Sequence, residues 1–159
     1  ISAEAADELS LKRLKATNDC EGCDLSNANL KGANLWEAYL KGANLKGADL
    51  TDANLESADL ESAFLTGANL SGAKLLQANL EGANLTGADI TDADIRRANL
   101  KGADLTDANL ESANLFRANL KGANLKGANL TDAKLKNIKL GNAKFCNTTL
   151  PWGLDNSGC

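Results

Sequence analysis

Four cysteines are the residues of this 159-residue chain best suited to chemistry, and they form two groups. The segment Cys20-Glu21-Gly22-Cys23 has the Cys-x-x-Cys spacing found in thiol–disulfide exchange sites, in metal sites and in short structural disulfides. The other two, Cys146 and Cys159, stand near the opposite end of the chain. The spacing alone leaves a structural disulfide, a redox-active pair and a metal site open for Cys20 and Cys23.

The composition removes most other chemistry. The chain has no histidine, so Ser-His and Cys-His nucleophile pairs, His-ligated zinc and the commonest general base at neutral pH are absent. A net charge of −4 argues against a nucleic-acid partner, which normally requires a basic footprint. No apolar run approaches the roughly 18 residues of a membrane-spanning helix. We therefore expect no enzyme activity, no catalytic residue, no cofactor, no bound metal, no nucleic-acid partner and no membrane span.

The chain between the two cysteine groups is a sequence repeat with a period of five residues. From Leu25 to Leu150 every fifth residue is large and apolar, and 23 of these 26 positions are leucine. The residue two places earlier is alanine in 23 units, and the residue between them is usually Asn or Asp. A period of five makes no continuous face on a helix, and on a continuous strand it sends alternate leucines to opposite sides. The chain must therefore turn once per unit and stack on itself as a solenoid.

The unit A-(N/D)-L-x-x, as in Ala43-Asn44-Leu45-Lys46-Gly47, resembles the pentapeptide-repeat family over about four fifths of the chain. The resemblance implies an all-β solenoid, a right-handed quadrilateral β-helix with four units, or 20 residues, per coil. It also implies that leucine and alanine side chains stack along the interior, which leaves no cavity for a substrate.

Three segments follow from this fold. Residues 1–17 have helical composition and belong to an N-terminal helical cap over 1–19, in which Leu11 and Leu14 are expected to cover the first coil. Residues 20–150 form the pentapeptide-repeat β-helix. Residues 151–159 form a C-terminal cap, where the proline ends the repeat and Trp152 is expected to shield the last leucines.

In a rod, the two cysteine groups lie at opposite ends, which excludes a single four-cysteine metal site. We expect two disulfides, Cys20 with Cys23 and Cys146 with Cys159, that close the ends of the solenoid. Disulfides indicate an oxidising compartment, and a chain that starts at Ile1 is consistent with a processed N-terminus. The ends resemble those of cyanobacterial and chloroplast family members, which implies the thylakoid lumen or the periplasm.

With 20 residues per coil, each outward residue is assigned to a face. The acidic face, built on the units from Leu30 to Leu150 in steps of 20, has a net charge of −5 and only Lys31 as a cation. Its acidic residues are Asp49, Asp52, Asp89, Asp92, Glu111 and Asp132. The basic face, built on the units from Leu35 to Leu135 in steps of 20, has a net charge of +3. Its cations are Lys74, Arg96, Arg97, Arg117, Lys134 and Lys136.

The basic face also displays Trp36, Leu76 and Phe116, spaced 40 residues apart. They are expected to align in one outward column on every second coil, about 10 Å apart. Large apolar side chains beside Arg96, Arg97 and Arg117 are typical of an interface. The sequence therefore favours a non-catalytic interaction module, a monomeric rod with an unidentified protein partner on this face.

Alternatives for the other features stay open. The acidic face keeps the rod soluble, binds calcium weakly, or contributes to the DNA mimicry by which some members of the resembling family inhibit DNA gyrase. The third functional hypothesis is a thiol–disulfide exchange protein that uses Cys20 and Cys23.

Overall fold

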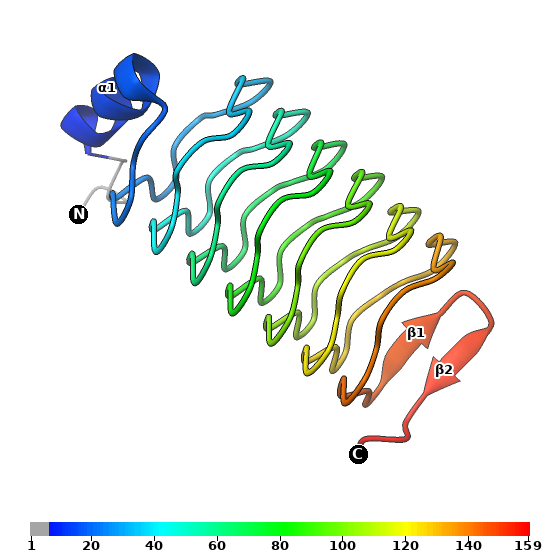
Figure 1. The fold of residues 1–159 in the computed structure, drawn as a ribbon. Helices are drawn as coiled ribbons and strands as arrows, with labels where there is room; N and C mark the ends of the chain where they lie inside the picture. The colour runs from blue at the N-terminus through cyan, green and yellow to red at the C-terminus, as the bar shows by residue number, and fades with distance from the viewer. Residues whose placement is uncertain (1–6) are drawn as a thin grey trace.

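The structure, a computed structural model, describes residues 7–159 and shows one stack of coils along a single axis (Figure 1). The outward residue of each unit pairs in parallel with the residue 20 positions later, as in Asn44 with Phe64. These pairs run without interruption from Asp19–Tyr39 to Asn129–Thr149. Since a unit has five residues, four units complete one coil. The predicted β-helix solenoid and its 20-residue coil are confirmed.

Each unit turns because of the two residues that follow the buried leucine. In the unit of Leu45, the amide of Ala48 donates to the carbonyl oxygen of Leu45 at 3.0 Å, and Gly47 has a φ of 64°. The same corner position has a φ of 58° at Arg97, so the turn is imposed on ordinary residues as well as on glycine. The Asn44 Oδ1 accepts a hydrogen bond from the Lys46 amide at 3.2 Å, which further stabilises the turn.

The Asn/Asp position also links the coils to one another. Asn99 Nδ2 donates to Asn79 Oδ1 at 3.2 Å, and Asn119 Nδ2 donates to Asn99 Oδ1 at 3.2 Å. One Asn side chain therefore accepts a hydrogen bond from an amide of its own turn and makes another with the Asn side chain of the neighbouring coil. This double use explains why the unit prefers Asn or Asp immediately before the leucine.

The core is a stack of leucine and alanine. Leu65 and Ala68 are both fully buried, and the same holds with little variation from Leu40 to Leu130. Each leucine contributes about 1.5–3 kcal/mol of hydrophobic stabilisation. Alanine, two residues before the leucine, is buried with it, and larger residues stand at this position only near the ends, at Cys23, Ile138 and Thr148.

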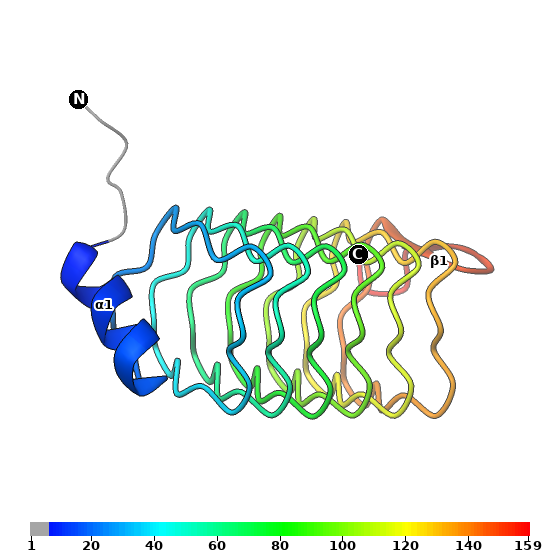
Figure 2. The same ribbon diagram turned by 90° about the horizontal axis from the view of Figure 1, so that it is seen from above.

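Helix α1, Glu8–Thr17, lies across the first coil at one end of the stack (Figure 2). Leu14 is 2% exposed, and Leu11 packs against the core. The sequence predicted a helix from residue 1 to 17, but it begins at Glu8 because Asp7 has a non-helical backbone and its side chain accepts from the Leu9 amide as an N-cap. Residues 1–6 of the predicted helix lie outside the described part of the chain. Within residues 7–159 we find no helix that combines the length and the hydropathy of a membrane span.

The C-terminal end is a hairpin. Strand β1, Thr148–Leu150, pairs antiparallel with strand β2, Gly153–Asp155, and Thr149 also pairs with Asn129 of the previous coil. The expectation that Trp152 shields the last leucines is wrong, because its side chain is 75% exposed in the hairpin connection. It stands at the edge of a cavity of about 250 Å³ that Leu135, Leu140 and Phe145 also line.

Candidate protein-interaction face

The coil-to-coil hydrogen bonds align the apolar column of the basic face, which we define as Trp36, Leu76 and Phe116. The Ser57 amide donates to the Leu76 carbonyl at 2.9 Å, and the Arg97 amide donates to the Phe116 carbonyl at 3.0 Å. Trp36 is 50% exposed, whereas Leu76 and Phe116 are half-buried. The predicted column therefore lies on one corner of the rod. Charged side chains occupy the same corner in the alternate coils: Glu56, Arg96 and Lys136.

The cations of the basic face differ in the groups that they contact. Arg96 binds the Asp94 carboxylate through two hydrogen bonds of 2.7 and 2.6 Å, and this bonding lowers the pKa of Asp94. Arg117 instead lies over the Phe116 ring, with its Cζ 5.0 Å from the ring centroid, a cation–π contact.

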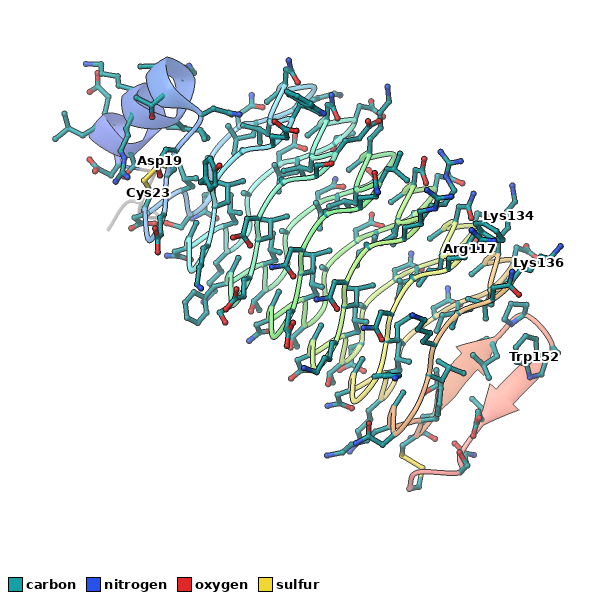
Figure 3. The ribbon with its side chains drawn as sticks, viewed as in Figure 1. Asp19, Cys23, Arg117, Lys134, Lys136 and Trp152 are labelled. Atoms are coloured by element: carbon teal, nitrogen blue, oxygen red, sulfur yellow. A yellow bond between two sulfur atoms is a disulfide. The ribbon has the colours of Figure 1, made fainter. Side chains whose placement is uncertain are left out.

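Arg117, Lys134 and Lys136 lie together towards the C-terminal end of the rod (Figure 3), where the Arg117 amide donates to the Lys136 carbonyl at 3.1 Å. Among residues 7–159, none of these three cations takes part in an ion pair. Their charges are therefore available to a partner that brings carboxylates.

A groove of about 660 Å³ borders the N-terminal end of the apolar column. It lies between α1 and the first coil, and Leu14, Leu30 and Trp36 are among its lining residues. Asn18 Nδ2 donates to the Trp36 carbonyl oxygen at 2.7 Å, which fixes the corner that carries the indole. The groove continues from the column towards the helix, and its lining is mixed, with Lys15, Asn29 and Lys31 beside the apolar residues.

Aspartates of the acidic face are engaged in their own turns. Thr51 donates to Asp49 Oδ1 from its hydroxyl at 2.6 Å and from its amide at 3.0 Å, and Thr91 bonds Asp89 in the same way. The hydroxyl bond is the main reason that the pKa of Asp49 is lowered. These carboxylates therefore have a structural role, and calcium binding and DNA mimicry stay predictions.

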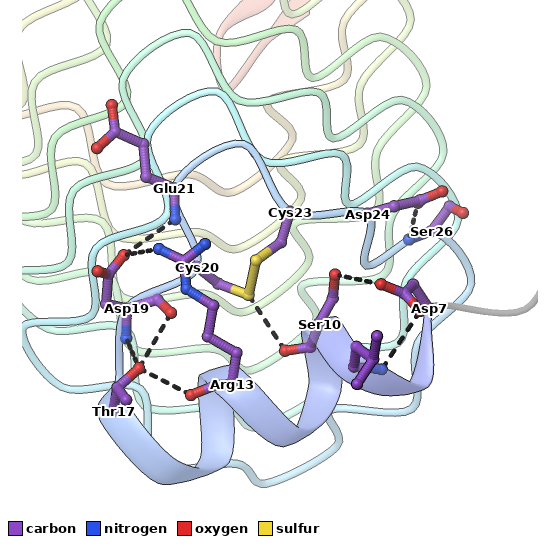
Figure 4. The surroundings of a disulfide bond; sticks show 11 residues. Asp7, Ser10, Arg13, Thr17, Asp19, Cys20, Glu21, Cys23, Asp24 and Ser26 are labelled. Carbon is purple, nitrogen blue, oxygen red and sulfur yellow. Dashed lines mark hydrogen bonds and ion pairs between the residues drawn. A yellow bond between two sulfur atoms is a disulfide. The ribbon is translucent and has the colours of Figure 1, made fainter.

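The N-terminal cysteine pair lies beneath α1 (Figure 4). Cys20 and Cys23 form a disulfide and are 0% and 7% exposed. Cys20 Sγ lies 3.2 Å from the Ser10 carbonyl oxygen of the helix, which covers the sulfur. An attacking thiolate needs access to a sulfur atom, so this burial disfavours the exchange hypothesis.

The second disulfide joins Cys146 to Cys159 and links the segment after the hairpin to the last coil. The Gly158 amide donates to the Phe145 carbonyl at 2.6 Å, and the Asn147 amide donates to Asn156 Oδ1 at 2.8 Å. The two cysteine pairs therefore stand at opposite ends of the solenoid.

The family model "Pentapeptide repeats (8 copies)" matches residues 23–61, 63–102 and 93–132, more than half of the chain. The chain belongs to the pentapeptide-repeat family. This membership confirms the resemblance drawn from the A-(N/D)-L-x-x array.

Among solved structures, this pentapeptide-repeat protein is similar to Rfr23 of the cyanobacterium Cyanothece 51142, at 34% identity and a TM-score of 0.62, over 85% of this chain and 92% of that one. HetL of Nostoc sp. strain PCC 7120, involved in heterocyst differentiation regulation, is 34% identical over 85% and 73% of the chains, with a TM-score of 0.43. AT2G44920 of the Arabidopsis thaliana thylakoid lumen is 34% identical over 70% of each chain, with a TM-score of 0.30. No curated protein matches the sequence.

The lowered carboxyl pKa values of this pentapeptide-repeat protein predict acid lability. Hydrogen bonds hold the pKa of Asp49 and Asp94 below the ordinary value of 3.8, so their stabilisation is present above that pH and is lost as the pH falls through the lower, folded-state pKa. We expect a constant melting temperature from about pH 7 to about pH 5 and a decrease below about pH 4, measured by circular dichroism. The Asp94→Asn variant should show a smaller decrease, and an unchanged melting temperature near pH 2 would contradict the prediction.

Two features of the site do not follow from the sequence pattern used to predict it. The groove beside Trp36 depends on how α1 meets the first coil, which no repeat pattern encodes. The pairing of Arg96 with Asp94 had a signal, since two residues of opposite charge stand two positions apart on one face. That signal would have indicated that the Arg96 side chain is paired within the chain.

Proposed function

We propose that this chain is a non-catalytic interaction module whose basic face binds a protein partner. The observation that carries the proposal is the apolar column Trp36, Leu76 and Phe116, held on one corner by the coil-to-coil hydrogen bonds. Arg117, Lys134 and Lys136 stand beside its C-terminal end and make no ion pair with any residue in 7–159. Interface energy concentrates in a few aromatic, apolar and arginine side chains that exclude water. A partner with an apolar strip and an acidic rim complements this surface.

We also propose a location and a detailed architecture for the chain. Two disulfides support an oxidising compartment, the thylakoid lumen or the periplasm. We further propose that the winding is right-handed, that residues 7–19, the described part of the predicted 1–19 cap, cover the first coil, and that the segment 151–159 caps the last. As a partner-bound rod, the chain is a monomer.

The test is capture of the partner from a lumenal or periplasmic extract by immobilised wild type and by a Trp36→Ser, Leu76→Ser, Phe116→Ser variant. A Tyr39→Ser, Phe64→Ser variant is the matched control, because these aromatics are 64% and 54% exposed on other faces. A partner held by wild type and control is expected to bind the triple variant at least 100-fold more weakly, because three interface anchors are lost.

The captured protein is then purified and titrated against all three forms, at low and at high salt. Added salt should weaken the wild-type complex, since the cations of the basic face contribute to it. Equal affinities for wild type and the triple variant would overturn the proposal.

A further inference from the structure

The two corner columns of the basic face have a self-complementary order. If the order of each column is reversed about its central residue, Leu76 or Gln77, each apolar residue coincides with an apolar residue and each glutamate coincides with an arginine. Over the five coils from Trp36 to Phe116, the first column contains Trp36, Glu56, Leu76, Arg96 and Phe116, and the second contains Glu37, Ser57, Gln77, Arg97 and Arg117. Lys136 and Asn137 continue the two columns by one coil outside this order.

The regular coil turns this order into a geometric match. Each amide of the second column donates to the carbonyl oxygen of the first column in the next coil, as Ser57 does to Leu76, so each step along the rod is the same, about 4.8 Å. When two antiparallel rods are related by a two-fold axis perpendicular to their length, each column faces the same column of the other rod, which runs in the opposite direction. With the axis at Leu76, the steps to Trp36 and to Phe116 are equal, and the register holds from Trp36 to Phe116.

We propose that a second copy of this chain binds antiparallel on the basic face. Leu76 meets Leu76 of the second copy, Trp36 meets Phe116, and Glu37 meets Arg117, each of the last two contacts occurring twice by symmetry. Glu37 and Arg117 are both exposed corner residues with positive φ, so both side chains point away from the core. Glu56 faces Arg96, whose guanidinium already holds Asp94.

The charge distribution of the whole chain independently favours the antiparallel orientation. Residues 1–95 contain 16 acidic and 7 basic residues, whereas residues 96–159 contain 5 acidic and 10 basic residues. An antiparallel pair places the acidic half of each rod beside the basic half of the other. A parallel pair places like charges together, which is unfavourable.

One like-charged contact lies at the axis, where Lys74 faces Lys74 of the second copy. Its charge is offset within each rod by Asp94 of the adjacent coil, whose pKa Lys74 helps to lower. The column from Trp36 to Phe116 spans four coil steps, about 20 Å, so the contact is smaller than a standard interface of about 800 Å² per partner. The pair is therefore weak and reversible. It uses the face of the proposed function and competes with the protein partner for it.

The test is sedimentation velocity from about 10 µM to about 500 µM protein, with wild type and two charge-reversed variants, Glu37→Arg and Arg117→Glu. Arginine and glutamate already occupy this corner position elsewhere, so both variants should fold, which circular dichroism checks. Wild type is expected to dimerise as its concentration rises. Each variant alone places like charges opposite each other twice and is expected to dimerise at least tenfold more weakly.

An equimolar mixture of the two variants restores both opposite-charge contacts, and it is expected to dimerise as wild type does. A wild type that stays monomeric, variants that pair as well as wild type, or a mixture that does not recover would each overturn the inference. These results are distinct from those of the partner titration. If the wild type stays monomeric but its partner still requires the apolar column, only the binding of a second copy is refuted. If the wild type dimerises but no partner is captured, only the proposed function is refuted.

Discussion

Replacing Leu75 by alanine is expected to lower the free energy of unfolding by about 2–5 kcal/mol. The Leu75 side chain is 1% exposed within the leucine stack, and the truncation removes apolar contacts and leaves a cavity. The surrounding coils are held in register by hydrogen bonds of 2.7–3.0 Å, so they relax little into the space. Urea unfolding followed by circular dichroism measures the change.

The matched control is the adjacent leucine. Leu76 follows Leu75 directly but points outward and is half-buried, so Leu76→Ala should cost about 1 kcal/mol or less. The two variants have identical composition, which isolates the effect of position in the repeat. Equal destabilisation of both would contradict the assignment of inward and outward positions.

Replacing Cys146 and Cys159 by serine is expected to loosen the C-terminal hairpin while the remaining coils stay folded. The disulfide closes a segment of 13 residues, and the chain-entropy relation assigns about 3 kcal/mol to a loop of this size. Each coil contacts only its neighbours, so the end opens without the rest. Hydrogen exchange at the Gly158 and Asn147 amides should accelerate roughly 100-fold.

The control for this prediction is the disulfide at the other end. A Cys20→Ser, Cys23→Ser variant should leave exchange at Gly158 and Asn147 unchanged, because the two disulfides stand at opposite ends of the solenoid and each coil contacts only its neighbours. The Leu75 amide, which donates to the Asp94 carbonyl at 2.7 Å, should stay protected in both variants. Faster exchange at Leu75 after loss of Cys146 and Cys159 would show that the solenoid opens as one unit.

The repeat makes most of the candidate site predictable. An unbroken phase from Leu25 to Leu150 assigns every residue to the interior or to a face, so the apolar column and its cations follow from the sequence alone. The groove beside Trp36 and the Arg96–Asp94 pair depend on contacts between side chains and elements that the period does not specify. Both features arise only when the chain is folded.

The sequence by itself determined which side chains are buried from Leu35 to Leu130, because a period of five with alanine and leucine permits one arrangement of inward positions. In the last coil the same pattern leaves Leu140 exposed and Leu135 and Phe145 partly buried. The tertiary structure decided how the ends are finished. Asp7 starts α1 at Glu8 through an N-cap, and Trp152 stays 75% exposed beside an open cavity instead of covering the last leucines. The physical reason is that a repeat dictates only contacts between equivalent units, whereas each end lacks a neighbouring coil and is stabilised by contacts that occur once.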